Sequence, residues 1–338
     1  EGSVGYPDLL FMKAPASVSS DKNTYGFNCG NQVIEYTYGT DTLSSYSSEE
    51  RNLASSDYDL EGAVGSDYQY SVLDDGTVTI TGYSGSDTVL VLPSEIDGKT
   101  VTGLQEFAFF ENTHITGITI SDHITAIEDE TFSGCTSLES ISIPASVTNI
   151  EVGAFNSCSS LSEITVSSDN PVYDSRNNCN AIIETASNTL IVGGKNTVIP
   201  QEITAIGTNA FNKRKGLTGI DLPEGLTGIN YGAFMYCEDL TGITLPESLT
   251  MLSDAVFKGC TSLESLTIPK NVAEIGGDLI LNCTNLTELK VDSENPVYDS
   301  RDNCNAVIET ASNTLLFGCK TASIPSGVTK IGGAAFYQ

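Results

Sequence analysis

The sequence predicts an elongated solenoid of mostly β structure, built from 23-residue repeats that begin near Val101. Each repeat opens on an apolar residue: Val101, Ile124, Val147, Ile203, Leu226, Leu249, Val272 and Val328. Eight residues after each opener comes a large apolar residue: Phe109, Phe132, Phe155, Phe211, Phe234, Phe257, Ile280 and Phe336. A period in the low twenties indicates units that cannot bury their own apolar face and that stack to do so.

Each repeat is predicted to contain a strand, a tight turn, a short helical turn around Ala-Phe, and a second strand. The second strand is indicated by an apolar pair, such as Ile118/Ile120, Ile141/Ile143, Ile243/Leu245 and Leu266/Ile268. A proline often follows this pair, as at Pro144 and Pro246. We expect these second strands to form one continuous sheet along a right-handed, curved solenoid.

Two spacings break the period, because Val147 to Ile203 and Val272 to Val328 are each 56 residues, one repeat plus 33. The extra segments 170–200 and 295–325 are identical at 23 of 31 positions, whereas the ordinary repeats before them share 7 of 23. One duplication followed by unequal divergence accounts for this difference. Each segment is predicted to form a β-hairpin, and we expect both hairpins to leave the solenoid on the same side.

The sequence predicts that the chain is divided into three parts. Residues 1–66 carry no repeat. Residues 67–100 are predicted to form a β-rich cap, with a hairpin that turns at Asp74-Asp75-Gly76 and covers the first repeat. Residues 101–338 hold the repeats, with inserts at about 167–200 and 292–325.

The formal charge of −29, from 44 acidic and 15 basic residues, argues against nucleic-acid binding, which needs clustered Lys and Arg. No run of about 18 apolar residues is present, so membrane insertion is not expected. The first residue is Glu1 rather than Met, which suggests either a processed product or a chain trimmed of its targeting signal. The last unit stops two residues after Phe336, and we expect the natural protein to continue beyond it.

Five cysteines form a column, one per repeat: Cys135, Cys158, Cys237, Cys260 and Cys283. We expect these thiols to be buried and reduced, because Asn112 and Arg214 replace Cys in other units of the same column. Cys304 and Cys319 lie in one insert and are the pair best placed to form a disulfide. The sister insert has Gly194 where the second carries Cys319.

The repeats Ile124–Pro144 and Leu249–Pro269 resemble the BspA-type leucine-rich repeat, since their period and their Phe, Cys and Pro positions agree together. The resemblance covers about residues 68–338, with departures at Arg214 and at Leu279-Ile280. It implies a secreted or surface-attached bacterial protein that acts in adhesion or protein recognition. It brings no catalytic motif, no cofactor and no fixed ligand-binding residues.

No pattern of residues indicates catalysis or a firm metal site. The two histidines, His114 and His123, lack a nearby nucleophile motif or ligands at metal spacing. Oxygen-bearing side chains cluster around Asn170 and Asn295 and are compatible with weak calcium binding, although such residues also form turns for local reasons. We therefore expect no enzymatic activity and no cofactor.

Two sets of residues are candidates for binding a protein ligand. The first is the polar face of the predicted sheet: Thr119, Ser142, Thr165, Thr244 and Thr267. The second is an aromatic and a basic residue in each insert: Tyr173, Arg176, Tyr298 and Arg301. β propensity alone also selects the first set, and packing of the insert alone also explains the second. The function predicted is a non-enzymatic extracellular adhesion module that recognises a host or neighbouring-cell protein; the alternative is a structural spacer for a catalytic or anchoring domain.

Overall fold

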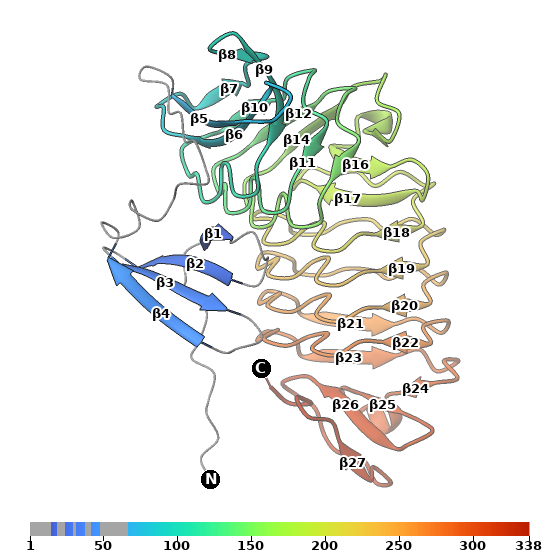
Figure 1. Cartoon of the computed structure of the whole chain (residues 1–338). Helices are drawn as coiled ribbons and strands as arrows, with labels where there is room; N and C mark the ends of the chain where they lie inside the picture. The colour runs from blue at the N-terminus through green and yellow to red at the C-terminus, as the bar shows by residue number, and fades with distance from the viewer. Residues whose placement is uncertain (1–14, 19–23, 30–31, 38–41, 48–66, 338) are drawn as a thin grey trace. The chain divides into compact units, whose positions relative to one another are not determined.

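The computed structural model describes residues 15–18, 24–29, 32–37, 42–47 and 67–337, and the chain divides into two compact units, Glu1–Gly62 and Ala63–Gln338. The strands of the first unit form an antiparallel sheet in sequence order (Figure 1). They are β1 (Pro15–Val18), β2 (Thr24–Cys29), β3 (Gln32–Thr37) and β4 (Thr42–Ser47).

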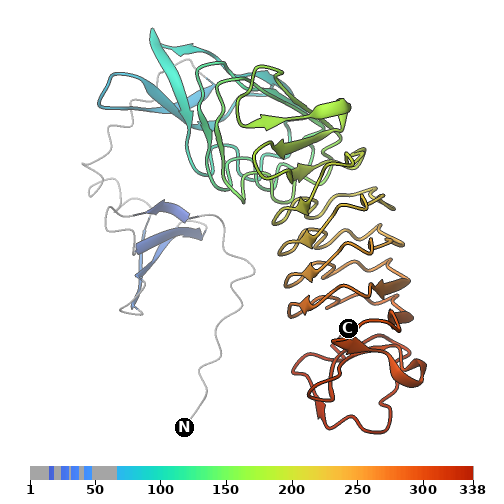
Figure 2. The ribbon, with the colours of Figure 1, turned by 90° about the vertical axis from the view of Figure 1, so that its right-hand side faces the viewer.

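The second unit is a β-solenoid, which confirms the predicted fold class, and Figure 2 shows its repeats as successive layers. Short strands at the repeat openings pair in parallel in two separate sheets, one before and one after the first insert, and we call these strands together the opening ladder. Its strands are β9 (Lys99–Leu104), β11 (Ala126–Ile127), β13 (Asn149–Ile150), β18 (Ala205–Ile206), β19 (Gly228–Ile229), β20 (Met251–Leu252) and β22 (Glu274–Ile275). Partners such as Ala205 and Gly228 lie 23 residues apart, as the period requires.

The second strands of the repeats form another parallel stack, the closing ladder. Its strands are β7 (Val89–Val91), β10 (Gly117–Thr119), β12 (Ser140–Ile143), β14 (Glu163–Val166), β21 (Ser265–Ile268) and β23 (Glu288–Val291). The first four form one sheet and the last two form another. The expected continuous sheet is therefore wrong, because residues 218–222 and 241–245 of the described chain form no strand.

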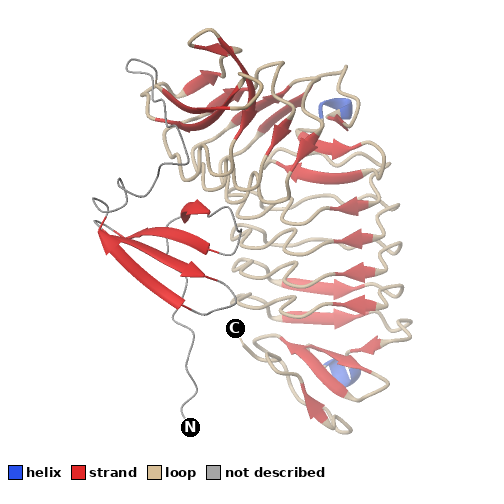
Figure 3. Cartoon of the chain, in the orientation of Figure 1, coloured by secondary structure: helices blue, strands red, loops and turns tan. Residues whose placement is uncertain are grey.

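Between the ladders, each repeat makes tight turns rather than the predicted helical turn. The described residues contain only two helices, the 3-10 turns η2 (Arg176–Asn178) and η3 (Arg301–Asn303), both inside the inserts (Figure 3). A left-handed residue precedes each member of the cysteine column, for example Ser157 at φ 60° and Gly259 at φ 74°. Such a residue reverses the chain too sharply for an α-helix to propagate.

The apolar columns predicted from the period form the core. Phe109, Phe132 and Phe155 stack with ring centroids 5.3 and 5.4 Å apart, and Phe211, Phe234 and Phe257 stack at 5.1 and 5.8 Å. Each column thiol donates a hydrogen bond to a phenylalanine carbonyl 26 residues earlier, as from Cys135 Sγ to Phe109 O at 3.1 Å. The eight cysteines of residues 67–337 are buried and free, Cys304 and Cys319 among them.

The predicted cap is a hairpin of β5 (Tyr68–Val72) and β6 (Val78–Tyr83). Strand β6 pairs in parallel with β9 and so covers the first opening strand, while β7 does the same for β10. The strand β8 (Glu95–Ile96) then turns into β9 through Asp97 and Gly98, both at positive φ. The N-terminal edge of each ladder is thus covered by a strand from outside the repeats.

The inserts contain the predicted hairpins, but the hairpins remain within the stack, contrary to our expectation. The first insert supplies β15 (Tyr173–Asp174), β16 (Ala181–Glu184) and β17 (Thr189–Gly193). The second supplies β24 (Tyr298–Asp299), β25 (Ala306–Glu309) and β26 (Thr314–Gly318), which pairs with β27 (Lys330–Ile331). Strand β17 pairs in parallel with β18, so the hairpin continues the opening ladder.

The first hairpin also separates two hydrophobic cores. Ile182 and Val192 pack into the core of the preceding repeats, whereas Ile183 and Leu190 pack into that of the following ones. Alternate residues of a strand point to opposite faces, and both faces are buried here. This explains the uninterrupted apolar run at residues 181–183, and why the hairpin stays in the stack.

Candidate binding surface

The closing ladder exposes a column of hydroxyl side chains on its first sheet. Thr119, Ser142 and Thr165 are paired in register on β10, β12 and β14. Thr119 and Thr165 are exposed and Ser142 is half-buried, while their neighbours Ile118 and Ile141 are in the core. Parallel pairing holds the three backbones in a fixed order, so these side chains form a row of hydrogen-bonding groups on a rigid support.

The other two predicted face residues lie apart from this row. Thr267 is exposed on β21, next to Lys290 of β23. Thr244 is also exposed, but it lies in the interruption of the closing ladder. There it lines a groove of about 900 Å³, together with residues that were not predicted to bind a ligand, among them Gly219 and Glu224. The structure thus places three of the five residues together and separates the other two.

The two insert tyrosines are buried, each with a relative exposure of 5%. The Tyr173 hydroxyl accepts a hydrogen bond from the Ile150 amide at 3.1 Å, and the Tyr298 hydroxyl donates one to the Ala273 carbonyl at 3.3 Å. Burial raises the pKa of both phenols. Each ring therefore packs its insert against the repeat before it, and little of the ring is left to contact a ligand.

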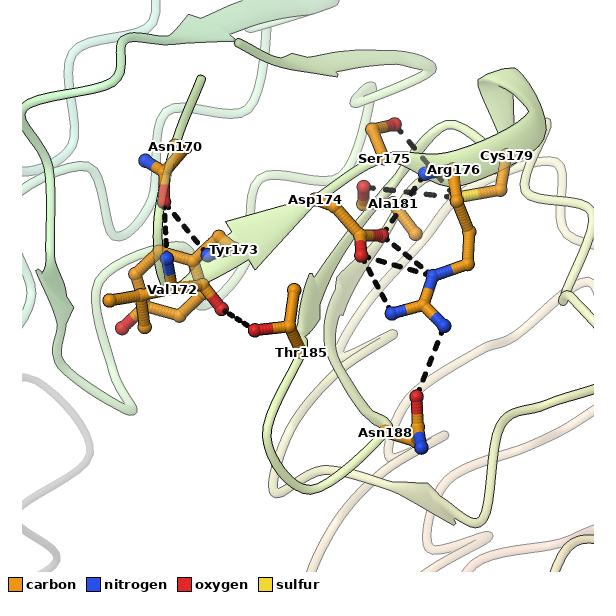
Figure 4. Close-up of polar contacts among 10 residues, drawn as sticks. All are labelled: Asn170, Val172, Tyr173, Asp174, Ser175, Arg176, Cys179, Ala181, Thr185 and Asn188. Atoms are coloured by element: carbon orange, nitrogen blue, oxygen red, sulfur yellow. Dashed lines mark hydrogen bonds and ion pairs between the residues drawn. The ribbon is translucent and has the colours of Figure 1, made fainter. Parts of the chain in front are cut away.

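The insert arginines are held by neighbouring side chains, as Figure 4 shows for the first insert. Arg176 Nη2 lies 2.6 Å from Asp174 Oδ2, and Nη1 donates to Asn188 Oδ1 at 3.1 Å. Arg301 makes the same contacts with Asp299 and Asn313. The hydrogen bond to Asp174 raises the pKa of Arg176. In the second insert, burial by itself would raise the pKa of the Asp299 carboxyl, but the hydrogen bonds from Arg301 outweigh it and hold that pKa below its ordinary value.

Asn170 and Asn295, around which the oxygen-bearing side chains cluster, fix the start of the two inserts. Asn170 Nδ2 donates to the carbonyls of Pro144 and Val147 at 2.7 and 2.8 Å. Its Oδ1 accepts from the amides of Val172 and Tyr173 (Figure 4). Asn295 makes the equivalent four bonds in the second insert. The signal that could have revealed this role is the recurrence of Asn-Pro-Val-Tyr at the same place in both inserts.

A family model for the BspA type leucine-rich repeat region matches residues 93–185 and 193–306, with six copies of the repeat. Together these segments make up more than half of the chain. The chain belongs to this family. The predicted resemblance is thereby confirmed, and the matched residues include the groove and all strands of the closing ladder except β7.

Several solved structures resemble the BspA-type chain. A leucine-rich cell surface protein from Faecalibacterium prausnitzii is 23% identical, with a TM-score of 0.47 over 68% of this chain and 88% of that one. A leucine-rich repeat protein from Eubacterium ventriosum is 18% identical, with a TM-score of 0.46 over 81% and 93%. The pneumococcal vaccine antigen PcpA is 18% identical, with a TM-score of 0.44 over 67% and 80%. No curated protein matches the sequence.

The described part of the BspA-type chain gathers no cluster of three or more His, Cys, Asp or Glu side chains suited to a metal ion. His114 and His123 are both exposed. Among the described residues, no helix is long and apolar enough to span a bilayer. The chemistry offered by the surface is that of hydrogen bonding, negative charge and scattered apolar contacts, which suits recognition of another molecule.

Proposed function

We propose that this BspA-type protein is a non-enzymatic binding module that acts outside the cell and recognises a protein of a host or of a neighbouring cell. The observation that carries the proposal is the in-register row of Thr119, Ser142 and Thr165 on a sheet whose other face is core. A location at the cell surface or in the medium is what the family resemblance implies.

The row suits protein recognition for a physical reason. Its three backbones are fixed by parallel pairing, so binding costs little additional ordering of the main chain. Short hydroxyl side chains also lose little entropy when a partner immobilises them, and each can both donate and accept a hydrogen bond. The row ends beside Val91 of β7, which is 71% exposed and adds an apolar contact next to Thr119.

The insert arginines remain secondary candidates within this proposal. Their side chains are partly exposed, with 26% for Arg176 and 30% for Arg301, so a partner can reach them. Their bonds to Asp174 and Asp299 also explain them as packing residues. Replacing both arginines with Ala separates the two roles, because a loss of partner binding at an unchanged melting temperature supports binding, whereas a loss of stability alone supports packing.

The proposal is tested by binding to a panel of purified host matrix proteins, such as fibronectin, laminin and collagen. A variant with Thr119→Arg and Thr165→Arg places two long side chains over the row and should weaken binding at least tenfold. The matched control is Thr227→Arg with Thr250→Arg, the same change at exposed threonines of the opening side. The proposal fails if no panel member binds, or if the control loses as much affinity as the first variant.

A further inference from the structure

The interruption of the closing ladder leaves main-chain groups unpaired in two successive repeats. Residues 219–222 and 242–245 make no hydrogen bond through their amides or carbonyls to any described residue. The layers are still linked just before the gap, where the Thr241 amide donates to the Thr218 carbonyl at 3.1 Å. The repeats are therefore stacked here, but the main chain beyond residues 218 and 241 has hydrogen-bonding groups to offer.

The first insert explains where the interruption lies. Strand β14 ends the first sheet, and the chain returns from the insert through a turn in which the Thr197 amide bonds to the Gly194 carbonyl. The following repeat therefore has no strand beside it on which to pair. Glycine alone does not cause the interruption, because Gly117 stands at the same repeat position as Gly219 and Gly242 and is paired within β10.

The two glycines also leave the main chain accessible. A side chain at Gly242 would meet nothing within 4 Å, and one at Gly219 would meet only the Gly242 carbonyl, at 3.8 Å. The groove of about 900 Å³ occupies this space, and exposed Val198 and Thr244 lie along it. A ligand backbone can thus approach the protein backbone directly.

The charge of the groove is uniformly negative. Asp221 and Glu224 line it and are exposed, and no Lys or Arg is among its lining residues. Neither carboxylate has an ion-pair partner in the described part of the chain. Beside them, Ile220, Leu222 and Ile243 are only partly buried and offer apolar contact.

We infer that this groove binds an extended peptide segment of a partner protein, one that carries a lysine or arginine. The peptide main chain pairs with the free amides and carbonyls of residues 219–222 on the side that faces the insert, where no strand lies beside them, as in recognition by strand addition. Its basic side chain reaches Asp221 and Glu224, and its small apolar side chains cover Ile220 and Ile243. The inference rests on the proposed function only in that the ligand is a protein segment.

The test uses short blocked peptides and the whole chain. The probe is a fluorescent, acetylated and amidated Thr-Val-Lys-Val-Thr-Val, titrated by anisotropy up to about 1 mM, a range that covers weak peptide affinities. Replacing Lys with Glu in the probe should weaken binding at least tenfold. Methylating alternate peptide amides removes main-chain donors without changing charge, and it should also weaken binding at least tenfold.

The chain itself supplies variants that should fold. Asp221→Lys and Glu224→Lys introduce residues that stand at the same repeat positions as Lys290 and Lys270. This double variant should lose the Lys probe and prefer the Glu probe. The matched control, Asp122→Lys with Glu163→Lys, changes the net charge equally at exposed positions outside the groove and should bind the Lys probe within twofold of the unaltered chain.

Three outcomes overturn the inference: no probe binds, the methylated probe binds as well as the parent, or both double variants behave alike. Failure of this inference and failure of the proposed function are distinguishable. Loss of probe binding with retained matrix-protein binding, still sensitive to Thr119→Arg and Thr165→Arg, removes the groove alone. Probe binding without any matrix-protein binding removes the proposed host ligand and keeps the groove.

Discussion

The residue directly before each cysteine of the column is constrained by its backbone conformation rather than by its side-chain chemistry. Gly259 at φ 74° and Tyr236 at φ 59° occupy this position in successive repeats. A Cβ at Gly259 would lie 2.2 Å from the Tyr236 ring, too close for any real contact. The Tyr236 ring therefore leaves no room for a side chain at residue 259 of the next layer.

Gly259→Ala should accordingly destabilise the protein more than Gly216→Ala. Both substitutions place alanine at a positive φ, which costs about 1–2 kcal/mol. At Gly216 the nearest atom lies 3.7 Å away, so little else is lost. At Gly259 the clash adds roughly 1–3 kcal/mol. Denaturant unfolding of the two variants measures the difference, and equal losses would show that the ring of Tyr236 moves aside freely.

The column thiols should resist alkylation in the native protein. Burial raises the pKa of Cys158 to about 11 and that of Cys237 and Cys283 to about 12. Because the thiolate is the reactive form, little of it is present at about pH 8. Iodoacetamide followed by peptide mapping should label these cysteines slowly in the native protein and fully in guanidinium chloride. Rapid labelling of the native protein would contradict their burial.

Among the elements, the first insert creates the most demanding junction. The repeats on its two sides meet directly along the cysteine column, where the Lys215 amide bonds to the Ser159 carbonyl. Arg214 fills the position of the missing thiol and is 1% exposed. Its guanidinium donates to the carbonyls of Cys158 at 2.9 Å and Gly193 at 2.6 Å, so one side chain links the preceding repeat, the hairpin and the following repeat.

Arg214→Met should cost about 3–5 kcal/mol of folding free energy, because it preserves the stem but leaves buried carbonyls without donors. Arg214→Cys, which restores the usual residue of the column, should cost at least as much, since a thiol cannot reach the carbonyls of both Cys158 and Gly193. Cys260→Ala is the matched control, and it removes a single bond to the Phe234 carbonyl. A fully stable Arg214→Cys protein would disprove the bridging role.

For the molecule as a whole, the sequence predicts the features that recur in every repeat, such as the apolar columns, but not the structure at the positions where the repeat is interrupted. The column of Phe132 and Phe155 follows from the period alone, because stacking equivalent positions is the way to bury them. The left-handed conformations of Glu130 and Ala255 have no signal in residue type and are imposed by the stacked turns. For the same reason, the predicted helical turn is wrong.

The surface was predicted less fully than the core. Thr119, Ser142 and Thr165 share a face because strand periodicity requires it. The groove depends on a missing partner strand, which no local sequence pattern indicates, since Gly117 at the same repeat position as Gly219 and Gly242 is paired within β10. Arg176 and Tyr173 were selected by residue type, but the structure alone shows that Arg176 bonds to Asp174 and Asn188 and that Tyr173 bonds to the Ile150 amide.

Amide hydrogen exchange, resolved to single residues, tests most directly the claim that the polar face of this solenoid is interrupted by an open, peptide-accepting edge. Amides of β12, which is paired on both sides, and those of β21 that bond to β23 should be strongly protected. Amides of 219–222 and 242–245 should exchange quickly, and those of 219–222 should become protected when the Lys-bearing probe is added. Uniform slow exchange across all four segments before any peptide is added would show a continuous sheet and contradict the account.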